Sequence, residues 1–259
     1  MGLIAIAADK GAPGVTTVAV SLAAVWPRRA IVAELDPFGG DIAFRLRGPR
    51  GVPLSPETGM LSLGLAARRG ADPQQVFEHV QRLDGGLEVL LGLSSSDQGA
   101  GMGTLWEPIA QLLDRVPDID VIGDCGRLYH GAPTLDVCRE ATAVVLVVRP
   151  TIDSVAHLRS RAAMLASHLR SGAVGTGGTP LFVVVVTGAR DDRSPKEIQH
   201  VLGTAQVPAT VIGRIAHDPR GAGMLEGEWI GRLDRSLLIR SARAVAARLA
   251  RVTSVQAAV

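Results

Sequence analysis

Eight consecutive residues near the start of the sequence have the types and the spacing of a loop that binds phosphate. They are Lys10, Gly11, Ala12, Pro13, Gly14, Val15, Thr16 and Thr17. The apolar run Leu3–Ala8 precedes them and predicts a strand, and Thr17–Trp26 follows with a helical pattern. Backbone N–H groups in such a loop and at the start of the next helix point to one place, where the helix dipole favours an anion. The stretch therefore predicts a phosphate-binding turn.

The charge that usually lies in such a loop is missing. In the pattern G-x-x-x-x-G-K-[ST] a lysine directly precedes the hydroxyl residue and reaches the β- and γ-phosphates, whereas this sequence has Val15 there. A lysine does stand at the front of the loop. Lys10 and Lys196 are the only lysines among 27 basic residues, and the others are arginines. The plain alternative is an ordinary strand-to-helix turn with glycines at positive φ.

Acidic side chains stand near the ends of two further predicted strands. Glu34 lies near the end of the apolar run Ala30–Leu35, and Asp36 directly follows this run. Asp124 directly follows the run Asp120–Gly123. A carboxylate at the carboxyl end of a strand beside a phosphate-binding loop can orient the attacking water or bind Mg²⁺ through water. Two plain alternatives stand beside this interpretation. Asp36 also suits an Asx-turn, and any α/β protein can carry an aspartate at a strand end.

In this order, the three motifs resemble those of the ParA/MinD family of P-loop ATPases. The family's deviant Walker A pattern, K-G-x-x-G-K-T-T, is matched at Lys10, Gly11, Gly14, Thr16 and Thr17, with Val15 as the departure. Its second-strand pattern, D-x-D-P-x-G-N, is matched at Asp36, Pro37 and Gly39, with Glu34 in place of the first acid. The stretch 120–126 resembles its Walker B motif, with Asp124 as the Walker B residue.

The resemblance implies a P-loop NTPase fold that binds ATP and Mg²⁺. Residues 10–17 would hold the phosphates; Thr16, Asp124 and Asp36 would hold the metal; and Asp36 and Lys10 would serve catalysis. In the family, ATP joins two subunits face to face, with the leading lysine reaching the partner's phosphates. Because Val15 supplies no charge, we expect hydrolysis to be slow or lost.

The same resemblance implies a spatial switch that positions a chromosome or plasmid, a division site, or a pilus or secretion machine, as in the TadZ/CpaE branch. The main alternative is a pseudo-ATPase scaffold that dimerises without nucleotide and binds a protein partner. A metabolic enzyme of the same superfamily is a third, weaker interpretation. Later motifs are blurred, because the family's adenine-facing Asn is absent from Thr187–Arg190 and Ala216 replaces a proline. The selectivity for the base therefore stays open.

Composition limits the other function classes. The formal net charge of +2 does not indicate a nucleic-acid binder, and 3% aromatic residues argue against a stacking platform for single strands. Cys125 and Cys138 are too few for a disulfide framework or a zinc site, and we expect free thiols in a cytoplasmic protein. The sequence shows no signal-peptide pattern and no apolar run of membrane-spanning length.

Apolar runs alternate with helical patterns along the sequence, which predicts a doubly wound α/β fold with a mostly parallel sheet flanked by helices, as one domain over 1–259. The remaining expected strands are Leu87–Leu93, Ala143–Val148, Leu181–Val186 and Ala209–Ile215. The remaining expected helices are Met60–Arg69, Pro73–Gln81, Leu105–Arg115, Leu135–Thr142, Ser154–Leu169 and Ser194–Gly203, the last with Ser194 as its N-cap. Gly48–Gly59, Ser94–Thr104 and Gly172–Thr179 are expected loops.

The C-terminal segment Arg235–Arg251 predicts a basic amphipathic helix. Its apolar face contains Leu237, Leu238, Ala242, Val245, Ala246 and Leu249, and its arginines lie mostly elsewhere. Such a helix can bind a membrane or DNA, but we expect it to pack on the sheet with its arginines in water. Strong membrane binding is not expected, because the apolar face is rich in alanine, whereas nonspecific DNA binding is plausible.

Overall fold

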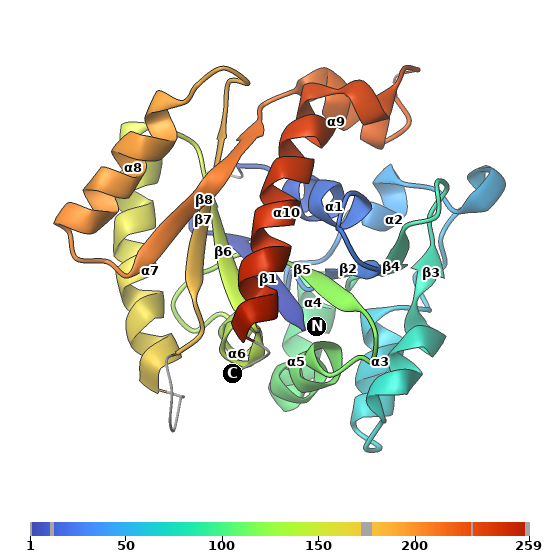
Figure 1. Cartoon of the computed structure of the whole chain (residues 1–259). Coiled ribbons are helices and arrows are strands. Elements are labelled where there is room, and N and C mark those ends of the chain that lie inside the picture. The colour runs from blue at the N-terminus through green and yellow to red at the C-terminus, as the bar shows by residue number, and fades with distance from the viewer. Residues whose placement is uncertain (1, 11–12, 172–177, 229, 257–259) are drawn as a thin grey trace.

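The structure is a computed structural model that describes residues 2–10, 13–171, 178–228 and 230–256. Within these residues, eight strands form one sheet in the order β3-β4-β2-β5-β1-β6-β7-β8 (Figure 1). The strands are β1 (Leu3–Ala8), β2 (Ala30–Glu34), β3 (Gln81–Arg82), β4 (Glu88–Leu90), β5 (Asp120–Arg127), β6 (Ala143–Val148), β7 (Leu181–Thr187) and β8 (Ala209–Ala216). All neighbouring pairs are parallel except β3 with β4. The predicted mostly parallel sheet is confirmed.

The central strands are buried on both faces, as their continuous apolar sequences predict. Every residue of β1, β6 and β7 is buried. Alternate residues of each strand belong to two separate apolar cores, with Leu3 in one and Ile4 in the other. A sheet of this kind needs helices on both faces, and Figure 1 shows that arrangement.

The helices divide between the two faces. The α-helices are α1 (Val15–Ala24), α2 (Ile42–Arg45), α3 (Met60–Ala67), α4 (Ser96–Met102), α5 (Trp106–Asp114), α6 (Thr134–Glu140), α7 (Ile152–Ser171), α8 (Arg193–Thr204), α9 (Pro219–Leu225) and α10 (Leu237–Gln256). Side chains of α1, α2 and α10 enter one core, and side chains of α3, α5, α6, α7 and α8 enter the other. Short 3-10 helices lie at Pro49–Gly51, Pro73–His79, Gly103–Leu105 and Leu233–Arg235.

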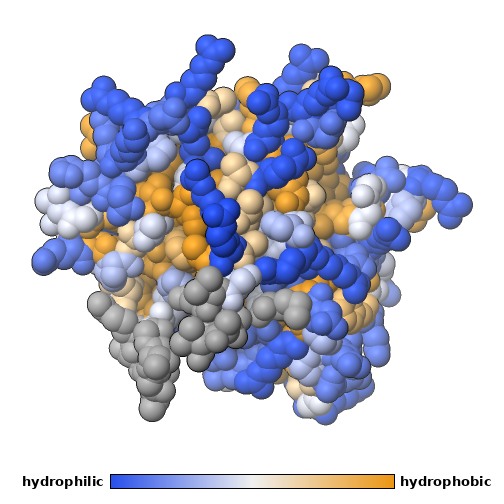
Figure 2. All heavy atoms as spheres, viewed as in Figure 1, coloured by the Kyte–Doolittle hydropathy of each residue, from blue (hydrophilic) through white to orange (hydrophobic). Residues whose placement is uncertain are grey.

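The C-terminal helix α10 packs on the body of the domain, as predicted. Leu238, Ala242, Val245 and Leu249 are buried in the same core as α1, although Leu237 is half exposed. The arginines of this segment are exposed, and Figure 2 shows hydrophilic side chains crossing the middle of the face that α10 covers. None of the helices within the described ranges is long and apolar enough to cross a membrane.

Several local predictions were wrong. Ser94–Thr104 is not a loop, because α4 forms inside it, with the Ser95 hydroxyl accepting a hydrogen bond from the Gln98 N–H. The helix predicted at Pro73–Gln81 is a 3-10 helix. Helix α8 starts one residue before Ser194, and the Asp191 carboxylate, not Ser194, accepts the backbone N–H of residues 193 and 194.

The bounds of two other segments differ less from the prediction. Gly48–Gly59 is mostly irregular but contains one 3-10 turn, and the strand expected at Leu87–Leu93 is limited to β4. The expected loop Gly172–Thr179 falls largely outside the described residues.

The first aspartate of the Walker B-like stretch has a structural role at the amino-terminal edge of the sheet. Asp120 is 1% exposed, and it accepts hydrogen bonds from Trp26 Nε1 and Arg28 Nε, both at 2.7 Å. It also accepts the backbone N–H of Gly2 at 3.2 Å. These bonds compensate the burial of the carboxylate and join β5 to the start of β1 and the end of α1.

Candidate phosphate and metal site

The candidate site lies at the carboxyl edge of the sheet, where β2, β5 and β1 are adjacent. The chain moves outward from β1 to β2 and β4, returns to β5, and then continues to β6 on the other side of β1. Such a reversal leaves a crevice at the carboxyl ends of the strands, which is the usual ligand position in open α/β sheets. The register pairs Asp124 of β5 with Ile6 of β1 and Glu34 of β2.

Gly14 turns the chain from the loop into α1. It is left-handed, with φ 94° and ψ 43°, a conformation that glycine adopts without strain. Its carbonyl accepts the Val18 N–H at 2.9 Å, so α1 begins directly after it. No described side chain caps this helix, and its first turn contains no acid. The helix start therefore offers N–H groups and the positive end of a dipole to an anion. Gly11 and Ala12 lie outside the described residues.

Val15 is the first residue of α1, at the place of the usual lysine. Its side chain is 9% exposed and belongs to the apolar core that α1 shares with β1 and α10. It also lines the cavity described below. The structure thus assigns the Val15 side chain a packing role, and this side chain has no donor or charge for a phosphate.

Thr16 and Asp124 meet at the base of the site, as the motif predicts. Asp124 is 1% exposed; it accepts the Gly126 N–H at 3.1 Å and a hydrogen bond from the Thr16 hydroxyl. Burial raises the pKa of the Asp124 carboxyl to about 7, although both hydrogen bonds oppose the shift. A hydroxyl and a carboxylate side by side are hard oxygen donors of the kind Mg²⁺ prefers, so the donor set fits this ion.

Asp36 follows β2 and lies close to the same place. Its Oδ1 accepts the Phe38 N–H at 2.9 Å, which is the Asx-turn expected as the plain alternative. The carboxylate also lies against Gly126, where a Cβ atom would come within 1.9 Å of Asp36 Oδ2. Gly126 has φ +58°, so this position needs glycine for both conformation and space. Burial raises the pKa of the Asp36 carboxyl.

Glu34 organises the loop that follows β2. It is 3% exposed, and its two carboxylate oxygens accept the N–H groups of Ile42 at 2.8 Å and Gly92 at 2.9 Å. A Cβ atom on Gly40 would approach this carboxylate to 2.2 Å. Glu34 therefore holds the segment between β2 and α2 against the end of β4, and burial raises the pKa of its carboxyl. The sequence motif singled out Glu34 as an acid near the end of a strand, but it did not predict that Glu34 holds this loop.

These residues surround an open cavity of about 610 Å³. Its described lining comes from β1, the loop, the start of α1, and the segments after β2 and β5. The lining residues are Ala8, Lys10, Pro13, Gly14, Val15, Thr16, Thr17, Asp36, Arg45, Gly126 and Arg127. Asp124 lies beneath this surface, in contact with Thr16. The structure thus brings together all the predicted site residues that it describes.

Among the described residues, three cations line the cavity, and two of them were missed by sequence reasoning. Lys10 was expected, but Arg45 and Arg127 were not. The residue before Lys10, Asp9, pairs with Arg161 of α7 and lies 3.4 Å from His157 Nδ1. Asp9 thereby fastens the front of the loop to α7. No single motif marks Arg45 or Arg127, because each reaches the cavity only through the fold.

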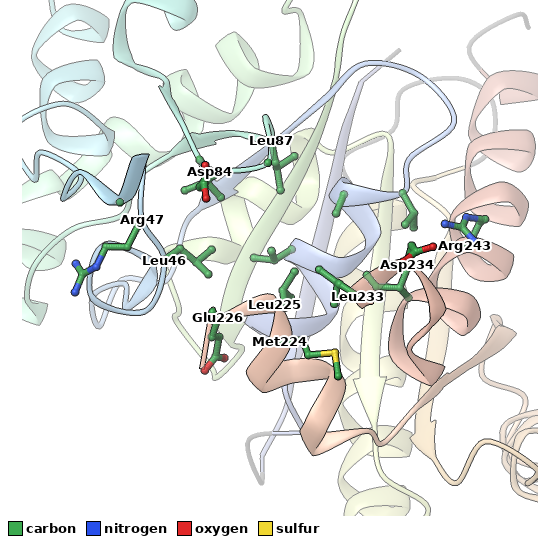
Figure 3. Close-up of a pocket in the computed structure, with 18 residues that line it drawn as sticks. Leu46, Arg47, Asp84, Leu87, Met224, Leu225, Glu226, Leu233, Asp234 and Arg243 are labelled. Carbon is green, nitrogen blue, oxygen red and sulfur yellow. The ribbon is translucent and has the colours of Figure 1, made fainter. Parts of the chain in front are cut away.

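A second cavity, of about 560 Å³, lies along the later part of α1. It is formed by α1, the β3–β4 turn, α9 and α10 (Figure 3). Its lining is mostly apolar, with Leu46, Leu87 and Leu225 among the side chains that face it. It contains none of the predicted site residues.

No family model matches this sequence, and no curated protein matches it. Solved structures match it over nearly the full length. The cell division ATPase MinD of Pyrococcus furiosus is 17% identical, with a TM-score of 0.70 over 97% of this chain and 100% of that chain. MinD of Pyrococcus horikoshii, complexed with Mg-ADP, is 13% identical, with a TM-score of 0.70 over 98% of each chain. McdA of Cyanothece, in a complex with ATP, is 14% identical, with a TM-score of 0.69 over 96% of each chain.

The fold is therefore that of the P-loop ATPases of the ParA/MinD type. The resemblance inferred from the loop and the two acidic motifs is confirmed at the level of the fold. Cys125 and Cys138 are free and buried, as expected.

The buried carboxylate at the base of the site predicts a pH-dependent cost. The folded-state pKa of Asp124, about 7, lies above the ordinary aspartate value of 3.8. The penalty for ionising it in the folded protein is therefore absent below about pH 4, grows as the pH rises, and is complete above pH 7. Asp124→Asn should raise the free energy of unfolding by roughly 2–4 kcal/mol at pH 8, and by little near pH 4.5.

Denaturant unfolding without nucleotide or Mg²⁺ measures this difference. Asp118→Asn, at an exposed aspartate before the same strand, is the matched control and should show no pH-dependent gain. A wild type as stable as Asp124→Asn at pH 8 would contradict the interpretation.

Proposed function

We propose that this protein binds Mg-ATP at the carboxyl edge of its sheet and acts as a nucleotide-dependent switch that positions cargo. The observation that carries the proposal is the contact between Thr16 and Asp124 beneath an uncapped helix start, at the base of a cavity of about 610 Å³. Helix start, hydroxyl and carboxylate are the parts that P-loop ATPases use for phosphate and metal. Solved structures of the same fold are described with Mg-ADP and ATP.

The residues divide into two groups. Backbone N–H groups of residues 14–17, with Lys10, would hold the phosphates, and Gly11, Ala12 and Pro13 would complete the loop. Thr16, Asp124 and Asp36 would hold Mg²⁺, directly or through water. The bound metal would neutralise charge on the phosphates. Asp36 and Lys10 are also the residues we assign to catalysis.

Hydrolysis should be slow or absent. The lysine that is missing at Val15 normally follows the charge of the γ-phosphoryl group as it leaves. ATP binding can still use the backbone amides, the helix dipole and the metal site. The transition state of hydrolysis lacks the preorganised charge of the missing lysine, so its stabilisation is weakened more than binding is. The protein would therefore change its partners with nucleotide occupancy rather than with rapid turnover.

The cargo belongs to the classes served by proteins of this fold. The solved structures include proteins described as septum site-determining, cell division and plasmid partition proteins. The degenerate loop favours the TadZ/CpaE-like branch, which positions pilus and secretion machinery. We expect a cytoplasmic homodimer that works through a protein partner, with nonspecific DNA binding through the exposed arginines of α10 and no strong membrane binding.

The carboxyl edge has features suited to a face-to-face dimer. Lys10 is exposed at the rim of the cavity. Phe38, after β2, is 58% exposed, and Ile152, at the start of α7, is 93% exposed. Large apolar side chains at the edge that carries the nucleotide site are suited to burial by a second copy.

A second candidate is a scaffold that dimerises without nucleotide. The burial of Val15 in the core favours it, because this position has become part of the packing. The scaffold and the switch differ in one property: only the switch binds Mg-ATP.

The leading lysine gives a prediction for the dimer. Lys10→Ala should weaken ATP-dependent dimerisation by about tenfold or more, because a charged contact to phosphate is lost at the interface. Sedimentation velocity with Mg-ATP measures it. Lys196→Ala, at the other lysine of the chain, exposed on α8, is the control and should dimerise like wild type. An unaltered Lys10→Ala dimer would place Lys10 in a solvated loop without a role.

Restoring the lysine gives a prediction for chemistry. Val15→Lys should tighten Mg-ATP binding by about tenfold, or roughly 1.4 kcal/mol, and raise a hydrolysis rate that is well below about 1 per second in wild type. Titration calorimetry and phosphate release measure the two effects. Unchanged affinity in Val15→Lys, together with no binding by wild type, would favour the scaffold. Turnover by wild type at about 1 per second would refute the slow-hydrolysis part of the proposal.

A further inference from the structure

Arg45 is the cation that lies beside the start of α1. It is the last residue of the short helix α2, which follows the loop that Glu34 holds in place. It lines the cavity of about 610 Å³ together with Thr16 and Thr17. It also lines a small hollow next to this cavity with the same two threonines. Its side chain is 35% exposed, so it is partly shielded from water but reachable from the cavity.

A carboxylate that lines the same small hollow forms an ion pair with Arg45. Glu226, the residue after α9, forms an ion pair with the Arg45 guanidinium through one oxygen, and the Glu226 side chain is 18% exposed. Glu226 also lines the second cavity, and Figure 3 shows it at the end of α9. The guanidinium has further N–H donors beyond the one that this contact uses.

We propose that Arg45 supplies the phosphate-binding charge that Val15 cannot, and that Glu226 competes with the nucleotide for it. The inference rests on the proposed binding of Mg-ATP. An arginine binds phosphate through two parallel N–H bonds, which makes it a good substitute for a point charge such as lysine. In the absence of nucleotide, Glu226 balances the charge. When phosphate enters, the guanidinium exchanges the carboxylate for phosphate oxygens.

The other two cations of the cavity are placed less well for this role. Arg127 directs its Nε–H to the backbone oxygen of Asp9 at 2.9 Å, so it helps to hold the front of the loop. Lys10 is the first residue of the loop and is exposed. Arg45 alone among the three shares both the cavity and the adjoining hollow with Thr16 and Thr17.

Competition by Glu226 makes the inference testable through the sign of two effects. If Arg45 only stabilises the fold through the ion pair, then removing either partner breaks the same contact and affects Mg-ATP binding in the same way. If Arg45 binds phosphate, then Arg45→Ala should weaken Mg-ATP binding by tenfold or more. Glu226→Gln frees the guanidinium and should tighten binding by about threefold or more.

The experiment is titration calorimetry with Mg-ATP on the full chain, for wild type, Arg45→Ala, Glu226→Gln and the double variant. Arg47→Ala is the matched control, because Arg47 is an exposed arginine two residues further along that lines the second cavity and not the one beside Thr16. Thermal melting of each variant without nucleotide reports whether the fold is retained. The double variant should bind as weakly as Arg45→Ala, because Glu226 acts only through Arg45.

The outcomes separate this inference from the proposed function. Weaker binding in Arg45→Ala with tighter binding in Glu226→Gln supports it. Binding by wild type that Arg45→Ala leaves unchanged, or that Glu226→Gln weakens to the same degree, overturns it and leaves the proposed function standing. Absence of Mg-ATP binding in both wild type and Glu226→Gln overturns both.

Discussion

The burial of the Asp124 carboxylate is the constraint on which the site depends. A carboxylate that is 1% exposed is costly to ionise, and the hydrogen bonds from Thr16 and Gly126 compensate only part of that cost. An apolar strand would place a hydrophobic residue here without any penalty. An acid at a position where ionisation is costly points to a use for its charge, and a bound cation would offset the cost of burying that charge.

The surrounding elements fix the position of Asp124 and of the residues next to it. Parallel pairing places β5 between β1 and β2, so that Asp124 lies beside the start of α1 and the segment that carries Asp36. Gly126 leaves room for the Asp36 carboxylate, and Glu34 fixes the loop that leads to α2. Apolar side chains of α1 and α10 pack in one core, and this packing fixes the position of α1, whose start faces the cavity.

The parts predicted from sequence are those with local signals. The strand, loop and helix at the amino terminus were predictable because the glycines, the threonine pair and the flanking apolar runs are contiguous. Asp36 was predictable because it follows a buried strand, and Asp124 because it follows the apolar run Asp120–Gly123, although β5 itself continues to Arg127. Helix α4 was missed because Ser and Gly dominate Ser94–Thr104, and tertiary packing of residues such as Met102 overrode their low helix propensity. The start of α8 was misplaced because Ser194 has the side chain of a good N-cap, whereas the N-cap residue is Asp192 and Asp191 accepts the first N–H groups.

The roles of Glu34 and Arg45 depend on partners distant in sequence. Glu34 binds the N–H of Gly92, and Arg45 pairs with Glu226, 181 residues away. No periodicity or motif contains such a contact. The same holds for Val15: the sequence shows that the lysine is missing, but only the fold shows that the valine is buried.

The most direct test of the account is hydrogen–deuterium exchange of the wild-type protein with and without Mg-ATP, because it reports on the backbone N–H groups that are proposed to hold phosphate. The account predicts slower exchange at Gly14–Thr17 and in the segment that carries Asp36 when Mg-ATP is present, with little change at β3 and β4, at the far edge of the sheet. Unchanged exchange of Gly14–Thr17 at saturating Mg-ATP would contradict it, and so would protection confined to the second cavity.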